Sequence, residues 1–543
     1  MGQILSIYSR LRNRKWDALD VAKENDLMFQ GFEWHVPADQ QHWNRLRESL
    51  PRLKSMGVNN IWIPPGCKGA TGGNGYDIYD LYDVGEFEQK GQTATKWGSR
   101  SDLEAFISLA NELDIGIYWD AVLNHKAGAD TKEKCVAVEV DPKGSDTPVT
   151  CSRPYSNSQI DRTVNISEPR EIEGWLGYDF PGRGTKHSEL KYHWYHFSGI
   201  NYDALQQKSG IYKLVGSGNK DWAKDVSTEN GNYDYLMFAD VDYSNIEVTN
   251  DVKRWIEWLG TEFKLKGLRL DAVKHYSRGF LKDFIQHIRT TVGRDWFLVA
   301  EYWTGDISDL LNYHDQMEGL VSLFDAPLAG RFSLFAKEGQ DLRKIFDKTF
   351  VQVHPQKAVT FVSNHDTQPG QSLEILIDAW FKPLAYALIL LRQDGYPCLF
   401  YGDLYGITNT EPKYRLPPVD KLAALATLRT MYAYGKQRDY FDNKKCVGFV
   451  RYGDTAHPSG LACVLNASTS AAPMSKTMYV GIRHAGEKWT EVFTSGAVTT
   501  APVEVDPRGY AEFKIGPKSV SVWVDEGAEG RGQIDVIGEQ FVD

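Results

Sequence analysis

Short apolar runs alternate with amphipathic helical segments along most of this chain. Segments such as 251–264 and 279–292 place apolar residues at the spacing of one helix face. Strands and helices in repeated alternation form parallel sheets, and eight such units in about 400 residues predict a (β/α)8 TIM barrel, with a doubly wound sheet as the alternative. The eight predicted strands cover residues 27–34, 59–65, 115–122, 265–273, 296–303, 320–327, 357–366 and 396–403.

Two stretches interrupt this repeat. Residues 125–240 are rich in Gly, Asn, Asp and aromatic residues and too long for a barrel loop, so we expect an inserted subdomain after the third strand. After about residue 420 the helical pattern fades and apolar runs alternate with turn residues, which predicts a C-terminal antiparallel β domain. The expected division is an N-terminal extension (1–24), the barrel (25–124 and 241–420), the insert (125–240), a C-terminal β-sandwich (421–526) and a tail (527–543).

The composition is that of a globular protein and excludes some classes of partner. The formal net charge of −11 is spread over 543 residues without a basic block, which argues against nucleic acid as a partner. Aromatic residues make up 13% of the chain, more than a core alone tends to use, and a sugar-binding cleft is one place for them. Apolar runs end after about ten residues, too short for a transmembrane helix.

The six cysteines show neither a CxxC pair nor a metal-ligand spacing, so buried, reduced thiols are expected. Cys135 and Cys151 flank a polar loop and would be able to pair in an oxidising compartment. The N-terminus has no apolar stretch long enough for a secretory signal. We therefore expect a cytoplasmic protein that is not secreted, and a monomer.

The segment GLRLDAVKH places two charged residues inside an apolar run. Arg269 and Asp271 are two positions apart, so in a strand both face the same side, where the guanidinium would hold the carboxylate ionised and oriented. A buried ion pair that only fixes the core is the alternative.

Other predicted strands also end in polar residues. The third ends in DAVLNH (with Asp120, Asn124 and His125), the fifth in AEYW and the seventh in SNHDTQ. Glycosidic bond hydrolysis needs one carboxylate as nucleophile and one carboxylic acid as proton donor. Three carboxylates on one rim of the barrel, those of Asp271, Glu301 and Asp366, would be able to supply this set.

The segments DAVLNH, GLRLDAVKH, AEYW and FVSNHD occur in the order of the four signature segments of the α-amylase family of glycoside hydrolases, and the chain resembles this family from about 25 to 525. KAVTFVSNHDTQPGQSLE is similar to the bacterial liquefying α-amylases in particular. The resemblance implies a retaining endo-hydrolase of α-1,4-glucosidic bonds in starch, glycogen or maltooligosaccharides. A 4-α-glucanotransferase is the alternative, and a catalytically silent glucan-binding protein is a third interpretation.

The resemblance also implies roles for individual residues. Asp271 would be the nucleophile, Glu301 the general acid/base and Asp366 a stabiliser of the transition state. A role in core packing is the alternative for Tyr76. The residues implied to bind or to line the substrate site are Tyr76, His125, Arg269 (which would orient Asp271), Lys274, His275, Trp303 and His365.

One calcium ion is implied between the insert and the barrel, because such relatives bind it through oxygen atoms that suit Ca²⁺. The implied ligands are Asn124, Asp234, Asp240 and the backbone carbonyl of His275. Bacterial relatives often bind a second calcium and a sodium nearby. The matching positions here hold Ser198, Ala223 and Ser244, which leaves Asp242 with few partners and predicts one calcium.

The first residues, MGQILS, match the pattern for N-myristoylation at Gly2. A basic patch follows (Arg10, Arg12, Arg14 and Lys15), and an acyl chain with such a patch can hold a protein on an anionic membrane. We therefore expect peripheral membrane association, as an intracellular eukaryotic member would use it. A solvated N-terminus is the alternative.

Overall fold

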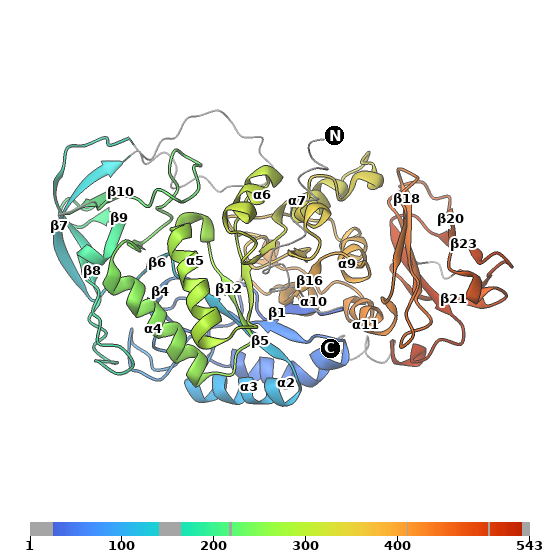
Figure 1. Ribbon diagram of the computed structural model, residues 1–543, viewed down its shortest axis with the longest axis horizontal. Helices are drawn as coiled ribbons and strands as arrows, with labels where there is room; N and C mark the ends of the chain where they lie inside the picture. The colour runs from blue at the N-terminus through green and yellow to red at the C-terminus, as the bar shows by residue number, and fades with distance from the viewer. Residues whose placement is uncertain (1–24, 141–163, 217–219, 410, 498–499, 535–543) are drawn as a thin grey trace.

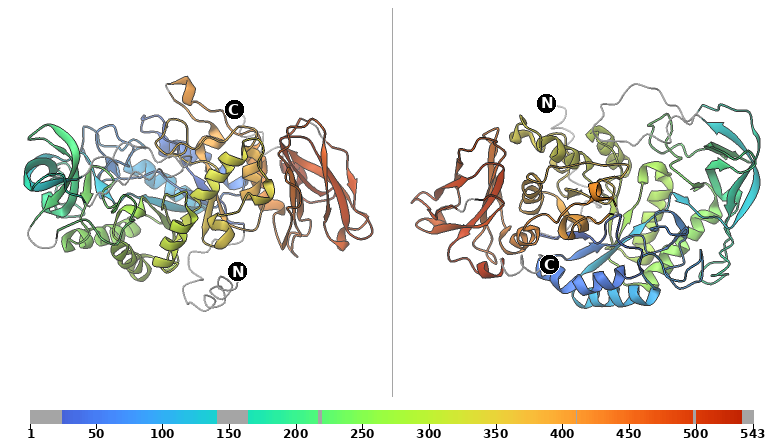
Figure 2. Two further views of the ribbon diagram at one scale, coloured as in Figure 1. Left: turned by 90° about the horizontal axis from the view of Figure 1, so that it is seen from above. Right: turned by 180° about the vertical axis from the view of Figure 1, so that it is seen from behind.

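The computed structural model describes residues 25–140, 164–216, 220–409, 411–497 and 500–534. A closed barrel lies in the middle of an elongated molecule, with an antiparallel sheet at one end and a β domain at the other (Figure 1). Figure 2 shows the same three parts from above and from behind. The predictions for Gly2 and Cys151 lie outside the described residues.

Eight parallel strands close the barrel in the order β1-β16-β15-β14-β13-β12-β5-β2, which confirms the predicted (β/α)8 fold. Nearly every strand residue is buried, as expected for strands that are covered on both faces. The strands are shorter than predicted because the predicted runs include the polar loop residues at their ends. They are β1 Met28–Gln30, β2 Asn60–Trp62, β5 Gly116–Ala121, β12 Gly267–Leu270, β13 Phe297–Ala300, β14 Ser322–Phe324, β15 Ala358–Phe361 and β16 Tyr396–Phe400.

Helices surround the barrel, and most of them pack one apolar face on it, whereas α9 and α11 are buried on nearly all sides. In α4, residues Val248, Val252, Trp255 and Leu259 are buried at helical spacing. This helix begins before the predicted segment 251–264 because Asn245 caps it through the backbone N–H of Glu247. The helices are α2 His42–Ser55, α3 Arg100–Glu112, α4 Ile246–Glu262, α5 Arg278–His287, α6 Ile307–Gln316, α7 Ala326–Phe335, α8 Phe350–Val353, α9 Lys382–Leu390, α10 Tyr401–Tyr405 and α11 Leu422–Tyr432.

An antiparallel sheet follows the third barrel strand, with the order β6-β11-β9-β10-β7-β8. Its own apolar cluster includes Ile172, Leu176, Phe197 and Leu214. The pair β6–β11 continues directly from the end of β5, so this sheet is attached next to the barrel's carboxyl rim. The strands are β6 His125–Lys126, β7 Thr131–Val140, β8 Arg170–Gly177, β9 Phe197–Asp203, β10 Lys208–Val215 and β11 Ala239–Val241, and a short hairpin (β3 Lys68–Gly69, β4 Ile78–Asp80) lies beside β6.

The C-terminal part is antiparallel, as predicted. One sheet has the order β17-β18-β19-β24-β21-β22 and the other pairs β20 with β23. Residues of β18 alternate: Val447 and Phe449 pack on the barrel core, whereas Cys446 and Val450 pack on the second sheet. The strands are β17 Gln437–Tyr440, β18 Cys446–Arg451, β19 Leu461–Asn466, β20 Met474–Tyr479, β21 Lys488–Thr494, β22 Val503–Glu504, β23 Tyr510–Ile515 and β24 Ser519–Asp525.

The expectation that helical structure ends near residue 420 is wrong for α11. This helix is buried from Leu422 to Arg429 and contacts α9, so its sequence lacks the polar face that makes a helix recognisable. The strands begin only at β17. The division between barrel and C-terminal domain at 420 and 421 stays a prediction.

Five cysteines, all those within the described ranges, are free and buried. They are Cys67, Cys135, Cys398, Cys446 and Cys463. Among the helices of the described residues, none combines the length and the apolar character needed to cross a membrane.

Candidate active site

One arginine connects three carboxylates at the carboxyl ends of neighbouring strands. The Nη1 atom of Arg269 donates to Asp120 (2.8 Å) and to Asp271 (2.6 Å), and its Nη2 atom donates to Glu301 (2.6 Å). Arg269 is 1% exposed. Because β12 pairs with β5 on one side and β13 on the other, its arginine lies between the carboxylates that those strands carry.

Asp120 is fixed from the opposite side as well. Its Oδ2 atom accepts hydrogen bonds from Trp62 Nε1 (2.9 Å) and from the Tyr76 hydroxyl (2.6 Å). Because Arg269 donates to Oδ1, both oxygens of this buried carboxylate have strong donors, and Asp120 holds Arg269 in place below Asp271 and Glu301.

Three nearly parallel aromatic rings lie close together beside the carboxylates. The Tyr76 ring is stacked on His365 (centroids 4.9 Å apart) and on Trp34 (5.8 Å apart), and all three planes are nearly parallel. The Nδ1 atom of His365 is 3.0 Å from Gln30 Nε2, and burial lowers the pKa of this histidine far below its usual value. His365 is therefore neutral, with Nδ1 as acceptor.

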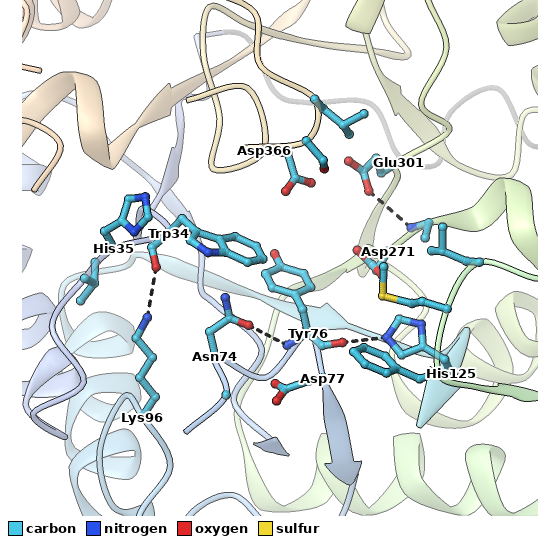
Figure 3. Close-up of a pocket in the computed structure, with 18 of the residues that line it drawn as sticks. Trp34, His35, Asn74, Tyr76, Asp77, Lys96, His125, Asp271, Glu301 and Asp366 are labelled. Carbon is cyan, nitrogen blue, oxygen red and sulfur yellow. Dashed lines mark hydrogen bonds between the residues drawn. The ribbon is translucent and has the colours of Figure 1, made fainter. Parts of the chain in front are cut away.

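A cleft of about 1400 Å³ opens over this arrangement. In Figure 3, Asp366, Glu301 and Asp271 lie along one side of it, and Trp34 and Tyr76 lie across from them. Arg269 and His365 do not line the cleft; they lie beneath the residues that do. Of the predicted site residues, those that line it are Tyr76, His125, Asp271, Lys274, His275, Glu301, Trp303 and Asp366.

His125 contacts Tyr76, because its Nε2 atom is 2.7 Å from the Tyr76 carbonyl oxygen. Burial lowers the pKa of His125 to about 4, so the ring is neutral at pH 7 and donates from Nε2. The two predicted substrate contacts thus position each other.

Lys274, His275 and Trp303 lie on the side of the cleft formed after β12. The Lys274 ammonium donates to Glu229 (2.8 Å) and to the Trp303 carbonyl (2.9 Å). Burial alone would lower the pKa of Lys274, but the Glu229 carboxylate together with Tyr233 and Tyr302 raises it above its usual value. The His275 Nδ1 atom is 2.9 Å from the Tyr233 carbonyl, which connects this side to the insert.

The backbone of GLRLDAVKH is tightly constrained around Asp271. A Cβ atom on Gly267 would lie 2.0 Å from the Phe297 carbonyl oxygen, so β12 and β13 pair closely only with glycine there. Ala272 has a left-handed φ of 49°, which is uncommon for a residue with a side chain. Its N–H points to Glu301 Oε2 (3.4 Å). The turn thus directs the backbone after Asp271 toward the second carboxylate.

The carboxyl groups of Asp271 and Asp366 retain protons more strongly than isolated aspartates, because their pKa values are raised. Burial raises the pKa of Asp271 despite Arg269, and Glu301 raises it further. Burial and then Glu301 also raise the pKa of Asp366. Several carboxylates that share one guanidinium titrate as a group, and such a group keeps a proton at a pH at which a lone aspartate has lost it.

The predicted calcium ligands lie where the insert meets the barrel. Asn124 and Asp240 are joined through Nδ2 and Oδ1 (3.3 Å), and the buried Oδ1 atom of Asn124 has no hydrogen-bond partner. Burial and mutual repulsion raise the pKa of Asp240 beside Asp234. His275 is held to Tyr233, the residue before Asp234.

These oxygen atoms fit a hard cation. Across the described residues, no group of three or more His, Cys, Asp or Glu side chains forms a metal site. The predicted set differs in kind, because it has only two carboxylates and its other ligands are an amide and a carbonyl. A buried amide oxygen without a partner beside two carboxylates that repel each other is what a Ca²⁺ ion would satisfy.

The expectation that Asp242 has few partners is wrong. The Lys220 ammonium donates to its Oδ2 atom (3.1 Å), and the hydroxyl and N–H of Ser244 donate to its Oδ1 atom (2.6 and 2.9 Å). Ser198 and Ala223 donate to Asp240 and Asp234. The prediction failed because Lys220 lies far from Asp242 in sequence and matches no motif.

Sequence reasoning also missed the other wall of the cleft. Trp34 lies in the cleft just after β1, and its N–H donates to Gln368 Oε1 (3.0 Å). Gln368 in turn donates to the buried Glu33 (2.8 Å), whose pKa is raised by burial. The run LMFQGFEW ends in an aromatic residue at the carboxyl end of a barrel strand, and that position was the available signal.

Comparisons with known proteins agree with this geometry. The family model described as "Alpha amylase, catalytic domain" matches residues 38–146 and 216–451. The alpha-amylase of Bacillus licheniformis is 43% identical over 512 residues (93% of this chain and 95% of that protein), and the cytoplasmic alpha-amylase of Escherichia coli strain K12 is 38% identical over 515 residues (92% and 99%).

The solved structure of an alpha-amylase from Geobacillus thermoleovorans, complexed with acarbose, is similar in fold. It has a TM-score of 0.58 and 17% identity, and the match covers 95% of this chain and 99% of that chain. With its matching family model and its similarity to the Bacillus licheniformis enzyme over nearly its whole length, this chain belongs to the alpha-amylase family of glycoside hydrolases.

Proposed function

We propose that this protein is an α-amylase that hydrolyses internal α-1,4-glucosidic bonds of starch, glycogen or maltooligosaccharides and retains the anomeric configuration. The observation that carries this proposal is the contact of one guanidinium, that of Arg269, with both Asp271 and Glu301 at the floor of an open cleft. Carboxyl groups that share one guanidinium lie close together. In retaining glycosidases the two groups are about 5 Å apart, whereas inverting enzymes leave room for a water.

In the first step, the Asp271 carboxylate attacks the anomeric carbon while Glu301 donates its proton to the glycosidic oxygen. The bond to the leaving sugar breaks, and a glycosyl ester on Asp271 forms. In the second step, Glu301 takes a proton from water, the hydroxide attacks the anomeric carbon, and Asp271 leaves as a carboxylate. Both groups end in their starting protonation states.

The surrounding residues have supporting roles in this proposal. Asp366 binds sugar hydroxyls as positive charge develops on the ring, and its raised pKa means that it can hold a proton before substrate binds. Tyr76 offers a flat aromatic face to the sugar. His125, which is oriented by the Tyr76 carbonyl, contacts the sugar hydroxyls. His365 supports the Tyr76 ring, and its Nε2 atom lies 3.5 Å from Asp366 Oδ2.

On the other side of the scissile bond, we assign Lys274, His275 and Trp303 to the departing sugar. Lys274 is already oriented by Glu229 and by the Trp303 carbonyl, so its remaining donor capacity can be directed into the cleft. All three residues line the cleft beside Glu301, the proton donor.

The proposal includes one Ca²⁺ ion held by Asn124, Asp234, Asp240 and the His275 carbonyl. Its support is the partnerless Asn124 oxygen beside two buried carboxylates. When bound, the ion neutralises these carboxylates and connects the insert to the segment after β12. The predicted calcium site lies next to the cleft, because its ligand Asn124 directly precedes His125, which lines the cleft.

A 4-α-glucanotransferase is the alternative, because it would use the same carboxylates with a sugar in place of water. Product analysis with maltoheptaose separates the two. Hydrolysis gives only shorter chains, whereas transfer also gives chains longer than seven glucose units. An Asp271→Asn variant serves as the control for contaminating activity, and early products longer than maltoheptaose would overturn the hydrolase proposal. If the wild-type protein showed no activity on maltoheptaose, the interpretation as a glucan-binding protein without catalysis would be the one that remains.

We place the enzyme in the cytoplasm, as a monomer. The free, buried cysteines of the described residues and the similarity to an enzyme named cytoplasmic alpha-amylase support the location. Membrane association through Gly2 stays a prediction from the sequence. Fractionation of the natural protein beside a Gly2→Ala variant tests it, and equal solubility of the two would contradict it.

A further inference from the structure

Lys220 is a buried ammonium group next to the predicted calcium ligands. Its Nζ atom is 3.1 Å from Asp242 Oδ2 and 3.0 Å from the Tyr195 carbonyl oxygen. The side chains of Lys220 and Asp242 are each only 8% exposed. Burial lowers the pKa of Lys220, and the Asp242 carboxylate opposes this shift.

Asp242 lies next to the predicted calcium ligands, because it follows Asp240 by two residues directly after β11. Ala223, three residues after Lys220, donates its N–H to Asp234 Oδ2 (3.0 Å), so the segment that carries Lys220 contacts both aspartates. The other acidic groups near Asp234 have partners elsewhere: Asp221 pairs with Lys213 (3.0 Å), and Asp225 accepts from Ser277 (3.0 Å) and the Gly279 N–H (2.7 Å). Asp234, Asp240 and Asp242 thus form one buried aspartate unit. Only the first two are predicted calcium ligands, and Lys220 is the cation paired with the third.

The charges of this unit balance only with both cations. Three carboxylates carry three negative charges, one divalent ion supplies two positive charges, and the Lys220 ammonium supplies the third. Buried charge without compensation is strongly destabilising. A second metal ion would therefore have to displace an ammonium that already engages the Asp242 carboxylate and the Tyr195 carbonyl.

We propose that Lys220 occupies the place of a second cation and thereby limits the junction of insert and barrel to a single divalent ion. This inference rests on the proposed calcium site. Without the ammonium, the Asp242 Oδ2 atom and the Tyr195 carbonyl oxygen lose their Lys220 donor, and both are oxygen ligands of the type that Ca²⁺ prefers. The Ser244 hydroxyl, bonded to Asp242 Oδ1, is a third oxygen beside them.

Calcium titration of chelator-treated, full-length protein by calorimetry tests the inference. The wild type is expected to bind one equivalent of Ca²⁺, the Lys220→Met variant two, and the Lys220→Met/Asp242→Asn double variant one again. Lys208→Met is the matched control, because Lys208 also pairs with a carboxylate of this sheet, Glu139 (2.7 Å), but lies outside the aspartate unit. It should bind one equivalent.

Thermal unfolding gives a second measurement. The Lys220→Met variant should unfold at a lower temperature than the wild type in low calcium and regain stability in millimolar calcium, and Asp242→Asn should remove that dependence. If the Lys220→Met variant binds only one equivalent of Ca²⁺ and its unfolding temperature depends on calcium no more than that of the wild type, the proposed role of Lys220 is overturned. A wild type that binds no calcium overturns the calcium site itself, so the two failures are distinguishable.

If Lys220→Met does not fold, two other variants decide. Lys220→Arg keeps the positive charge and should still bind one equivalent. The Asp242→Asn variant leaves the Lys220 ammonium without its own carboxylate, next to Asp234 and Asp240. Because this unpaired positive charge repels Ca²⁺, the variant should bind the single calcium roughly tenfold more weakly, or weaker still. Unchanged affinity in Asp242→Asn overturns the inference that Asp242 and Lys220 belong to the metal unit.

Discussion

The rings of Tyr76 and His365 lie face to face, with centroids 4.9 Å apart and planes 9° from parallel. His365 has no contact with the open cleft, whereas Tyr76 lines it. The buried, neutral His365 ring therefore fixes the orientation of the Tyr76 ring, whose other surface can contact a sugar. Trp34 lies beside both rings, 5.8 Å from Tyr76 and 6.0 Å from His365, and it lines the cleft next to Tyr76 (Figure 3).

Replacement of Trp34 by Ala should weaken binding of maltooligosaccharides. Stacked aromatic pairs contribute about 0.5–1.5 kcal/mol, so KM should rise by roughly two- to tenfold, with a smaller change in kcat. Trp34→Phe should retain most of the affinity. Trp380→Ala is the control, because that ring lies near Lys518 of the C-terminal domain. An unchanged KM in Trp34→Ala would show that the ring only covers the stack.

Glu301→Gln should preserve the shape of the site and remove the proton donor. Proton transfer by a positioned side chain contributes roughly 10²- to 10⁴-fold, so kcat on maltooligosaccharides should fall by at least that range. Substrate binding to the variant, measured by calorimetry, should persist. Glu104→Gln, at an exposed glutamate paired with Arg100, is the control. An active Glu301→Gln variant would refute the mechanism.

The acid side of the pH profile should depend on Asp120. Asp271 must be ionised to attack, and its raised pKa means that kcat/KM begins to fall at a higher pH than an ordinary aspartate would give. The Asp120 charge contributes to that rise, so Asp120→Asn should lower the pKa of Asp271 and move the acid limb down by roughly one unit.

Asp130→Asn is the matched control for this profile, because Asp130 also accepts from a tyrosine, Tyr79 (2.7 Å), but outside the cleft. Its acid limb should coincide with that of the wild type. A limb that stays in place or moves upward in Asp120→Asn would contradict the electrostatic account.

Removal of calcium should lower thermal stability and activity together. A ligand that binds only the folded state at a hundredfold excess over its Kd stabilises it by about 2.7 kcal/mol. Asn124→Ala removes the partnerless oxygen, so its unfolding temperature should respond much less to a chelator than that of the wild type. Asn44→Ala, on the surface of α2, should respond fully. Equal responses of Asn124→Ala and wild type would contradict this ligand assignment.

Gly267→Ala should destabilise the barrel, because the added Cβ would lie 2.0 Å from the Phe297 carbonyl. Overpacking of this kind typically costs about 1–3 kcal/mol, measurable as the free energy of unfolding in denaturant. Gly330→Ala in α7 is the control, since nothing lies within 4 Å of its added Cβ and alanine is the better helix former. A Gly267→Ala variant as stable as Gly330→Ala would disprove the close approach.

The sequence was sufficient for the barrel and for the location of the carboxylates. Each buried strand is a continuous apolar run, so all eight could be predicted, and Asp271 and Glu301 stand directly after two of them. The helix α11 was missed because it is apolar on all sides and gives no periodic signal.

Contacts between distant parts of the chain could not be predicted. Lys220 pairs with Asp242, and Trp34 contacts Gln368. Folding brings the residues of each pair together, and nothing in the sequence indicates that they meet. In both cases one partner lies in a loop without a motif of its own. The sequence indicates what such residues can bind, whereas the fold determines which of them meet.

The bond between Arg269 and Asp120 also sets an order of events during synthesis. The ribosome adds Asp120 149 residues before Arg269, and at about 5–20 residues per second this delay lasts roughly 7 to 30 s. During that time β5 carries a carboxylate that would be costly to bury without its counter-ion. We expect the nascent barrel to stay open at this edge until β12 has emerged, so the first half of the chain is the part that would need a chaperone's protection.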